Sequence, residues 1–197
     1  MKIEFIIPTW DRPNNLMVIL ASLVAQTNSN WTAHVIIDGI TDDYRKVKDL
    51  YQDEERIRFS HITGPNKDWG HKARNYGLDN AKEEWIVMTG DDNYYVPLFV
   101  HEFLSYDKIN ECKFMYCNLV HNAFRPGYKA ISSTLQKGQI DIGNFMCRRE
   151  LIGDIKINTK SYEGDWEFVD EFMKNNIKTF EPHTSIIKID KFLYVHN

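Results

Sequence analysis

Residues 85–97 have the sequence Trp-Ile-Val-Met-Thr-Gly-Asp-Asp-Asn-Tyr-Tyr-Val-Pro. The apolar run at 85–88 has the length of one buried strand. It is followed closely by Gly90, Asp91, Asp92 and Asn93, and the interior of a strand could not bury three such polar side chains without partners. This change from apolar to polar residues predicts a buried strand that ends in a polar turn.

The neighbouring carboxylates Asp91 and Asp92 allow two interpretations. In open α/β sheets ligands bind at the carboxyl ends of the strands, and a cation between two carboxylates there would relieve their repulsion. Hard oxygen ligands suit Mn²⁺ or Mg²⁺, which bring phosphate oxygens with them. The other interpretation is a solvated turn without a metal. This short segment does not by itself separate the two.

The composition describes an ordinary soluble domain. The chain has 197 residues, 43% of them apolar and 26% charged, which suits one domain with a substantial core. A net charge of −4 and a pI near 6.0 argue against a nucleic-acid partner. The three cysteines lack the spacing of a zinc site, so we expect free thiols and a reducing compartment.

Targeting signals are not expected either. The first residues, Met-Lys-Ile-Glu-Phe-Ile-Ile-Pro, contain Glu4 and reach Pro8 too soon for a signal peptide. No apolar run approaches the ~20 residues that span a bilayer. We therefore expect a cytoplasmic protein without a transmembrane segment.

Strand and helix patterns alternate through about the first 105 residues. The predicted strands are 3–7, 33–37, 57–62 and 85–89, and the predicted helices start near Pro13 and cover 44–51, 70–81 and 97–106. This alternation predicts an α/β fold with a mostly parallel central sheet and helices on both faces.

The second half has a different rhythm. We expect strands at 114–120 and 186–195, a possible short strand at 179–181, a helix at 166–175, and a short helix after 141–149. Residues 122–138 are polar and rich in turn residues, and they predict a loop or hairpin over the sheet. Neither a repeat nor a linker interrupts the sequence, so one domain is expected.

Three predicted strands end in polar residues, namely at Thr9-Trp10-Asp11, Asp38-Gly39 and Asp91-Asp92. If the sheet is parallel, these ends converge on one edge. Trp10 can stack there on a nucleotide base, Asp38 can accept a hydrogen bond from the base or ribose, and the acidic pair can hold a metal on the phosphates.

The glycine-rich phosphate loops of other nucleotide-binding proteins are absent. The chain has neither Gly-x-Gly-x-x-Gly after the first strand nor a Gly-x-x-x-x-Gly-Lys-Ser/Thr sequence. We therefore expect the phosphate charge to be met by a metal and by Gly70, Lys72 and Arg74.

Four motifs resemble those of the family 2 glycosyltransferases with a GT-A fold. They are Pro8-Thr9-Trp10-Asp11-Arg12, Ile36-Ile37-Asp38-Gly39, Ala73-Arg74-Asn75-Tyr76-Gly77-Leu78 and Gly90-Asp91-Asp92-Asn93. The resemblance implies one GT-A-like domain over 1–197, with a nucleotide-sugar half at 1–97 and an acceptor half at 98–197. It also implies a Mn²⁺- or Mg²⁺-dependent enzyme that moves a sugar from a nucleotide diphosphate donor to a hydroxyl of a glycan or other acceptor. We expect inversion, because a single base would act on the face opposite the leaving group, and a UDP-sugar donor, because Asp38 could accept the imide N–H of uracil.

Site residues follow from the same resemblance. Donor contacts are expected from Pro8, Thr9, Trp10, Asp11, Asp38, Gly70, Lys72, Arg74 and Asp91. Asp92 corresponds to the metal-binding aspartate, with Asp91 and the near-terminal His196 as further candidate ligands. Gly90 stands where the family's Asp-x-Asp motif has its first aspartate. Asp165 falls where the family has its catalytic base, although Gly164 replaces the usual glutamate.

Several alternatives remain open. Asp165 could be a helix N-cap, and His196 could be a terminal histidine without a function. The other histidines (34, 61, 71, 101, 121 and 183) show no ligand spacing and are interpreted as surface or packed residues. At the level of the whole chain, a non-catalytic nucleotide- or glycan-binding module is the main alternative, and a nucleotidyltransferase is a weaker one because its glycine- and arginine-rich entry loop is missing.

Overall fold

The computed structural model describes residues 1–39, 44–122, 127–181 and 184–197. Its first half contains the strands β1 (Ile3–Thr9), β2 (Trp31–Asp38), β3 (Ile57–Ile62) and β4 (Trp85–Met88). They pair in parallel in the order β3-β2-β1-β4. The parallel arrangement predicted for this half is confirmed.

The second half extends the same sheet with mixed pairing. It adds β8 (Phe145–Arg148), β6 (Phe114–His121), β9 (Ile186–His196) and β7 (Lys129–Ile131), together with the short β5 (Tyr94–Tyr95). Strand β8 is antiparallel to β4 and β6, β9 is parallel to β6, and β5 and β7 pair antiparallel to their neighbours. The predicted α/β fold is thus confirmed; the sheet is mixed, and its longest pairings, β1–β2, β2–β3 and β6–β9, are parallel.

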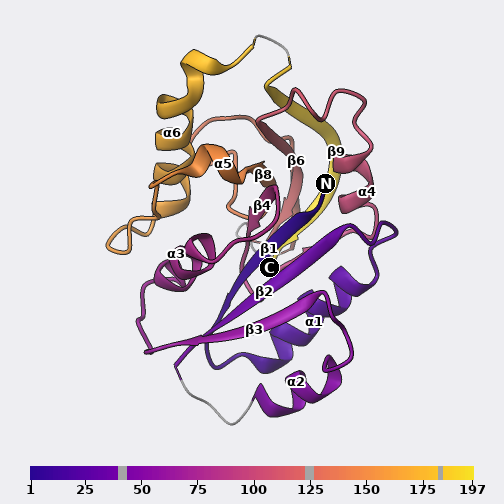
Figure 1. Cartoon of the computed structure of the whole chain (residues 1–197), viewed down its shortest axis with the longest axis vertical. Coiled ribbons are helices and arrows are strands. Elements are labelled where there is room, and N and C mark those ends of the chain that lie inside the picture. The colour runs from indigo at the N-terminus through magenta and orange to yellow at the C-terminus, as the bar shows by residue number, and fades with distance from the viewer. Residues whose placement is uncertain (40–43, 123–126, 182–183) are drawn as a thin grey trace.

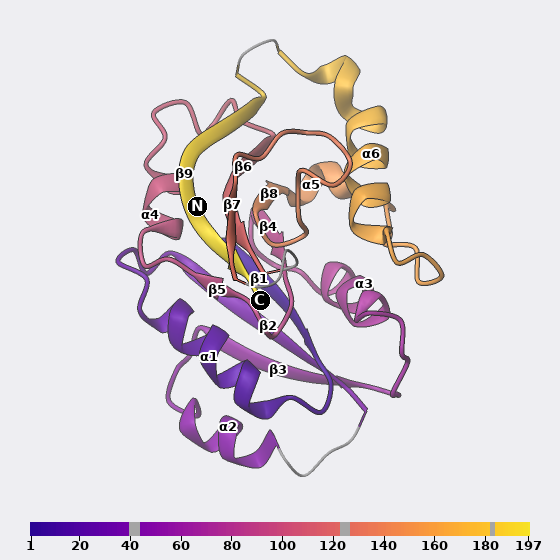
Figure 2. The same ribbon diagram turned by 180° about the vertical axis from the view of Figure 1, so that it is seen from behind.

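Helices cover both faces of the sheet, as predicted (Figures 1 and 2). The helices α1 (Pro13–Val24), α2 (Arg45–Leu50) and α4 (Phe99–Leu104) lie on one side, and α3 (His71–Asp79), α5 (Arg149–Ile152) and α6 (Gly164–Asn176) lie on the other. Because side chains alternate along a strand, β1 directs Phe5 into the first core and Ile6 into the second.

Two local predictions differ from the structure. The prediction of a short strand at 179–181 is wrong, because the chain forms the 3₁₀ helix η2 (Ile177–Thr179) there. Phe180 N donates a hydrogen bond of 3.2 Å to Ile177 O and closes this turn. Strand β8 was missed within 141–149. Of the predicted loop or hairpin at 122–138, residues 123–126 lie outside the described part, and β7 pairs with β6 as a hairpin would.

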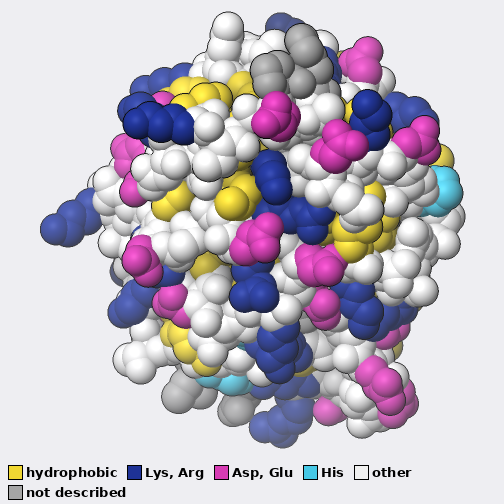
Figure 3. Space-filling model, turned by 45° about the horizontal axis from the view of Figure 1, so that its top comes forward, with side chains coloured by type: hydrophobic (Ala, Val, Ile, Leu, Met, Phe, Trp, Pro, Cys, Tyr) yellow, Lys and Arg dark blue, Asp and Glu magenta, His cyan; other side chains and the backbone are white. Residues whose placement is uncertain are grey.

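The surface and the cysteines agree with the composition. All three cysteines are free thiols and buried. Within the described ranges, none of the helices combines the length and apolar character needed to cross a membrane. Figure 3 shows basic and acidic side chains interspersed over the face that it presents. A cytoplasmic location stays a prediction.

Candidate active site

The carboxyl ends of the parallel strands open into a cavity of about 580 Å³. Eight of the residues selected from the sequence line it, and they are Pro8, Thr9, Trp10, Asp38, Gly70, Arg74, Asp92 and His196. Asp11 and Lys72 do not belong to its lining, and Asp91 lies behind it, fully buried. The expected convergence of strand ends therefore occurs, with His196 brought in from the end of β9.

Two side chains at the strand ends differ strongly in exposure. Trp10 follows β1, lines the cavity and is 42% exposed. Asp38 ends β2, is buried, and accepts hydrogen bonds from Asn66 N at 2.9 Å and Asn66 Nδ2 at 2.6 Å. Asp38 thus anchors the loop after β3, and a nucleotide base would share this carboxylate with Asn66.

Arg12 bridges the two acidic residues that follow β4. Its Nη2 lies 2.8 Å from Asp91 Oδ1, and its Nη1 lies 2.8 Å from Asp92 Oδ2. Thr9 Oγ1 donates to Asp91 Oδ2 at 2.7 Å. Burial raises the pKa of Asp91 to about 6, against the opposing effects of Thr9 and Arg12. Sequence reasoning gave Arg12 no role, although it lies within the first motif.

Gly90 leaves room for Asp92. A Cβ atom at position 90 would lie 2.7 Å from Asp92 Oδ1 and 3.2 Å from Asn93 Nδ2. Such distances are too short for ordinary packing. A side chain at position 90 would therefore require the carboxylate of Asp92 to move from its present position.

Arg74 lies beneath the cavity as a buried cation. Its Nε donates to Thr89 O at 3.1 Å and its Nη1 to Trp69 O at 2.8 Å. Burial lowers its pKa from the usual value, while the charges of Asp141 and Asp165 act in the opposite direction. The guanidinium thus contributes positive potential to the region where acidic groups gather.

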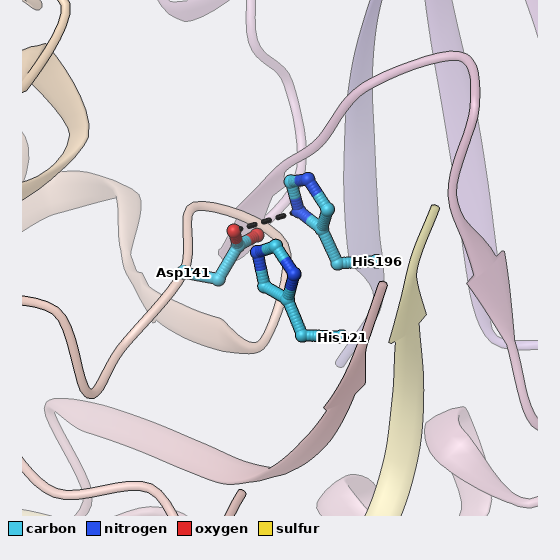
Figure 4. A group of neighbouring side chains, drawn as sticks. All are labelled: His121, Asp141 and His196. Carbon is cyan, nitrogen blue, oxygen red and sulfur yellow. Dashed lines mark ion pairs between the residues drawn. The ribbon is translucent and has the colours of Figure 1, made fainter. Parts of the chain in front are cut away.

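His196 belongs to a cluster with Asp141 and His121, which Figure 4 shows converging from separate parts of the chain. His196 Nδ1 lies 2.8 Å from Asp141 Oδ2, and Tyr194 OH donates to Asp141 Oδ1 at 2.7 Å. Burial alone would raise the pKa of Asp141, but the hydrogen bond and charge of His196 outweigh it and lower that pKa to about 2. Asp141 was missed and His121 was set aside, since their spacing in the sequence gives no signal.

The three side chains have ligand atoms within 4.8 Å of one another, as a metal site would. However, the rings of His121 and His196 stack with centroids 4.1 Å apart and planes at 9°. Since imidazole lone pairs lie in the ring plane, two stacked parallel rings cannot direct them at one ion unless a ring turns. Because Nδ1 of His196 is paired with Asp141, Nε2 is the atom left for a ligand.

Asp165 lines a second cavity of about 400 Å³, which shares Arg74, His196 and several other lining residues with the first. The cap alternative does not hold, because the N-cap residue of α6 is Glu163 and Asp165 lies in the first turn. Asp165 Oδ1 accepts the N–H of Trp166 at 2.7 Å. Burial and the charge of Asp141 raise the pKa of Asp165, which makes its carboxylate a stronger base.

Comparisons with known proteins agree with this arrangement. The sequence pattern of Glycosyl transferase family 2 matches residues 4–164. A Rickettsia felis protein described as an uncharacterized glycosyltransferase is 32% identical over 139 residues, which cover 64% of this chain and 22% of that protein. A Haemophilus influenzae protein with the same description is 23% identical over 127 residues, which cover 62% of this chain and 42% of that protein. The chain thus matches about a fifth to two fifths of the length of these relatives.

Solved structures show the same fold. Residues 1–349 of S. aureus TarS match with a TM-score of 0.78 and 20% identity, covering 100% of this chain and 60% of that one. TarS in complex with UDP-GlcNAc gives a TM-score of 0.75 and 21% identity, covering 99% and 58%. The mannosyltransferase PcManGT from Pyrobaculum calidifontis, in complex with GDP-Man and Mn²⁺, matches with a TM-score of 0.68 and 12% identity. The match covers 98% of this chain and 56% of that one.

Proposed function

The chain belongs to glycosyl transferase family 2, and we propose on that basis that it transfers a sugar from a nucleotide diphosphate sugar to an acceptor hydroxyl. One observation carries the proposal: Asp38, Asp92 and His196, which are far apart in the sequence, line one cavity. That cavity adjoins a second one containing Asp165. Residues 1–97 then supply most of the donor site and 98–197 most of the acceptor site.

The donor is proposed to be a UDP-sugar. Trp10 offers an exposed indole on which a base can stack. The carboxylate of Asp38 can accept the imide N–H of uracil, a donor that cytosine lacks at the same position. Arg74 lies below the region where the diphosphate would lie, and the binding of UDP-GlcNAc by the TarS neighbour supports this donor class.

A divalent ion fits the donor atoms of this site. The Asp92 carboxylate and Nε2 of His196 would hold Mn²⁺ or Mg²⁺, with Asp91 behind them. Asp92 and His196 line the same cavity, and these ions accept carboxylate oxygens and imidazole as ligands. Such an ion supplies Lewis-acid stabilisation of the negative charge on a leaving diphosphate. The Mn²⁺ in the PcManGT neighbour supports this assignment.

Asp165 is proposed as the general base. Burial raises its pKa and so makes the carboxylate a stronger base, and the Trp166 N–H donates to one of its oxygens. The acceptor hydroxyl would give its proton to this carboxylate while its oxygen forms the new bond to the anomeric carbon and the diphosphate leaves with the bonding electrons. Because a single base acts on the face opposite the leaving group, the reaction inverts the anomeric centre.

The test measures donor turnover and donor binding separately. UDP-sugar hydrolysis or transfer is expected with Mn²⁺ and is expected to disappear with chelator. Asp165→Asn should retain UDP binding, measured by thermal shift, but lose turnover, whereas the matched change Asp154→Asn on an exposed turn should alter neither. Full turnover by Asp165→Asn would remove Asp165 from the role of base.

A non-catalytic nucleotide-binding module remains the second candidate, and two observations favour it. Arg12 already neutralises Asp91 and Asp92, and Gly90 removes one metal ligand of the family motif. Stabilisation by UDP without turnover of any UDP-sugar tested would favour the module over the enzyme.

A further inference from the structure

The two cavities meet at a pair of exposed aromatic side chains, Trp69 and Tyr162. Both residues line both cavities. Trp69 is 54% exposed and Tyr162 is 75% exposed, and their rings contact edge to face with centroids 5.7 Å apart. Large aromatic side chains normally contribute to stability by burial, so two that remain open beside a candidate base call for another explanation.

The backbone holds Trp69 in a conformation that packing alone would not select. Its φ is 58°, in the left-handed region that aromatic residues rarely adopt; the next residue, Gly70, has a φ of 81°, and Lys67, two residues earlier, has a φ of 53°. The loop is nevertheless fixed, because Arg74 Nη1 donates to Trp69 O at 2.8 Å and Lys72 N donates to Asp68 Oδ2 at 2.9 Å. Strain of this kind persists where the surroundings enforce it and occurs often at ligand sites.

The chemistry around the pair favours a neutral ligand. Lys137 in the second cavity is paired with Glu163 at 2.6 Å, and Asp141 is paired with His196 at 2.8 Å. The remaining charged residues of this lining, Arg74 and Asp165, have opposite signs, so little net charge is left to attract a phosphate or carboxylate. Pyranose rings present a face of C–H groups, and an exposed indole provides a flat apolar surface of matching size.

We propose that Trp69 and Tyr162 form a stacking platform for a neutral sugar ring of the acceptor, held next to Asp165. This inference rests on the proposed function and adds to it that the acceptor is a glycan. Trp10 differs from Trp69 in lining the first cavity but not the second, so the two exposed tryptophans have separate roles, Trp10 for the base and Trp69 for the acceptor sugar.

The experiment uses the methyl pyranosides of glucose, galactose, mannose and N-acetylglucosamine as probes. Their binding to the protein, with and without UDP, is followed by saturation-transfer difference NMR of the glycosides, and their contact with Trp69 in the wild type by ¹⁹F NMR of 5-fluorotryptophan. At least one glycoside should shift the Trp69 resonance. Trp69→Ala should weaken its binding about tenfold, as expected for loss of one aromatic stacking contact, and Tyr162→Ala should weaken it less. Trp69→Phe, which keeps a ring, should retain most of it.

Trp10→Ala is the matched control: it should weaken UDP binding and leave glycoside binding unchanged, the reverse of Trp69→Ala. Failure of all four glycosides to bind the wild type, or equal binding by Trp69→Ala, would overturn the platform. The wild type could bind UDP and a UDP-sugar alike while Trp69→Ala binds the UDP-sugar more weakly than UDP. That result would assign the aromatic pair to the donor sugar and would also overturn the platform. Failure of UDP itself to bind would count against the proposed function. The two failures can be distinguished, because the glycosides are also tested without UDP.

Discussion

Replacement of Arg12 by methionine is expected to destabilise the metal-free protein. The guanidinium contacts Asp91 and Asp92 at 2.8 Å each, and its loss leaves the fully buried Asp91 without its ion-pair partner, although the charge of Arg74 still acts on it. An exposed ion pair contributes up to about 1 kcal/mol, and removal of one partner from a fully buried pair costs about 3–5 kcal/mol. The side chain of Arg12 is 50% exposed, so we expect a loss of about 2 kcal/mol, between these limits.

A loss of this size lowers the Tm of a chain of this length by roughly 4–8 °C, which calorimetry in the presence of chelator can measure. Mn²⁺ should then raise the Tm of Arg12→Met by more than that of the wild type, because the ion supplies the charge that Arg12 supplied and no longer competes with it for Asp92. The Tm of Arg12→Lys should lie between those of the wild type and Arg12→Met, since one ammonium group cannot make the two contacts that the guanidinium makes with the carboxylates.

Lys46→Met removes an exposed cation from α2 and serves as the control, with no change expected in either measurement. An Arg12→Met protein that melts like the wild type would show that the bridge does not stabilise the fold. An equal gain from Mn²⁺ in the wild type and in Arg12→Met would show that Arg12 and the metal do not compete, and the reasoning on this site would then fail.

Three further predictions follow from individual side chains. Asp38→Ala should reduce the preference for UDP over CDP in calorimetric titrations, and equal binding of the two nucleotides by the wild type would exclude Asp38 from reading the base. Gly90→Asp should weaken Mn²⁺ binding, because its Cβ would lie 2.7 Å from Asp92 Oδ1; tighter binding would mean that the turn accepts the family's first aspartate. Burial, then the charge of Arg58, lowers the pKa of His34 from 6.5 to about 4. Its stabilising contribution, up to about 3 kcal/mol, is therefore present above pH 6.5 and lost as the pH falls towards 4, and urea titrations of His34→Gln should lack this loss.

The sequence determined the parts of the fold that depend on local patterns. Apolar runs such as 85–88, each followed by polar residues, located the parallel strands of the first half, and their ends indicated where the cavity would lie. The polar residues at those ends, Trp10, Asp38 and Asp92, were selected for the same reason, since neighbours in sequence decide where a buried strand stops. The antiparallel β8 and the turn at 177–179 escaped notice, because short segments adopt the structure that their tertiary contacts select.

Only the tertiary structure decided which side chains meet. Arg12 contacts acidic residues about eighty positions away, and Asp141 contacts His196 from a different element. Such pairs leave no periodic or spacing signal, because they arise when separate strands and loops pack together. Trp69 lies in a loop that a hydrogen bond from Arg74 holds, and Tyr162 meets its ring from a segment about ninety positions later. Local propensity placed the strand ends, and long-range packing placed their charged and aromatic partners.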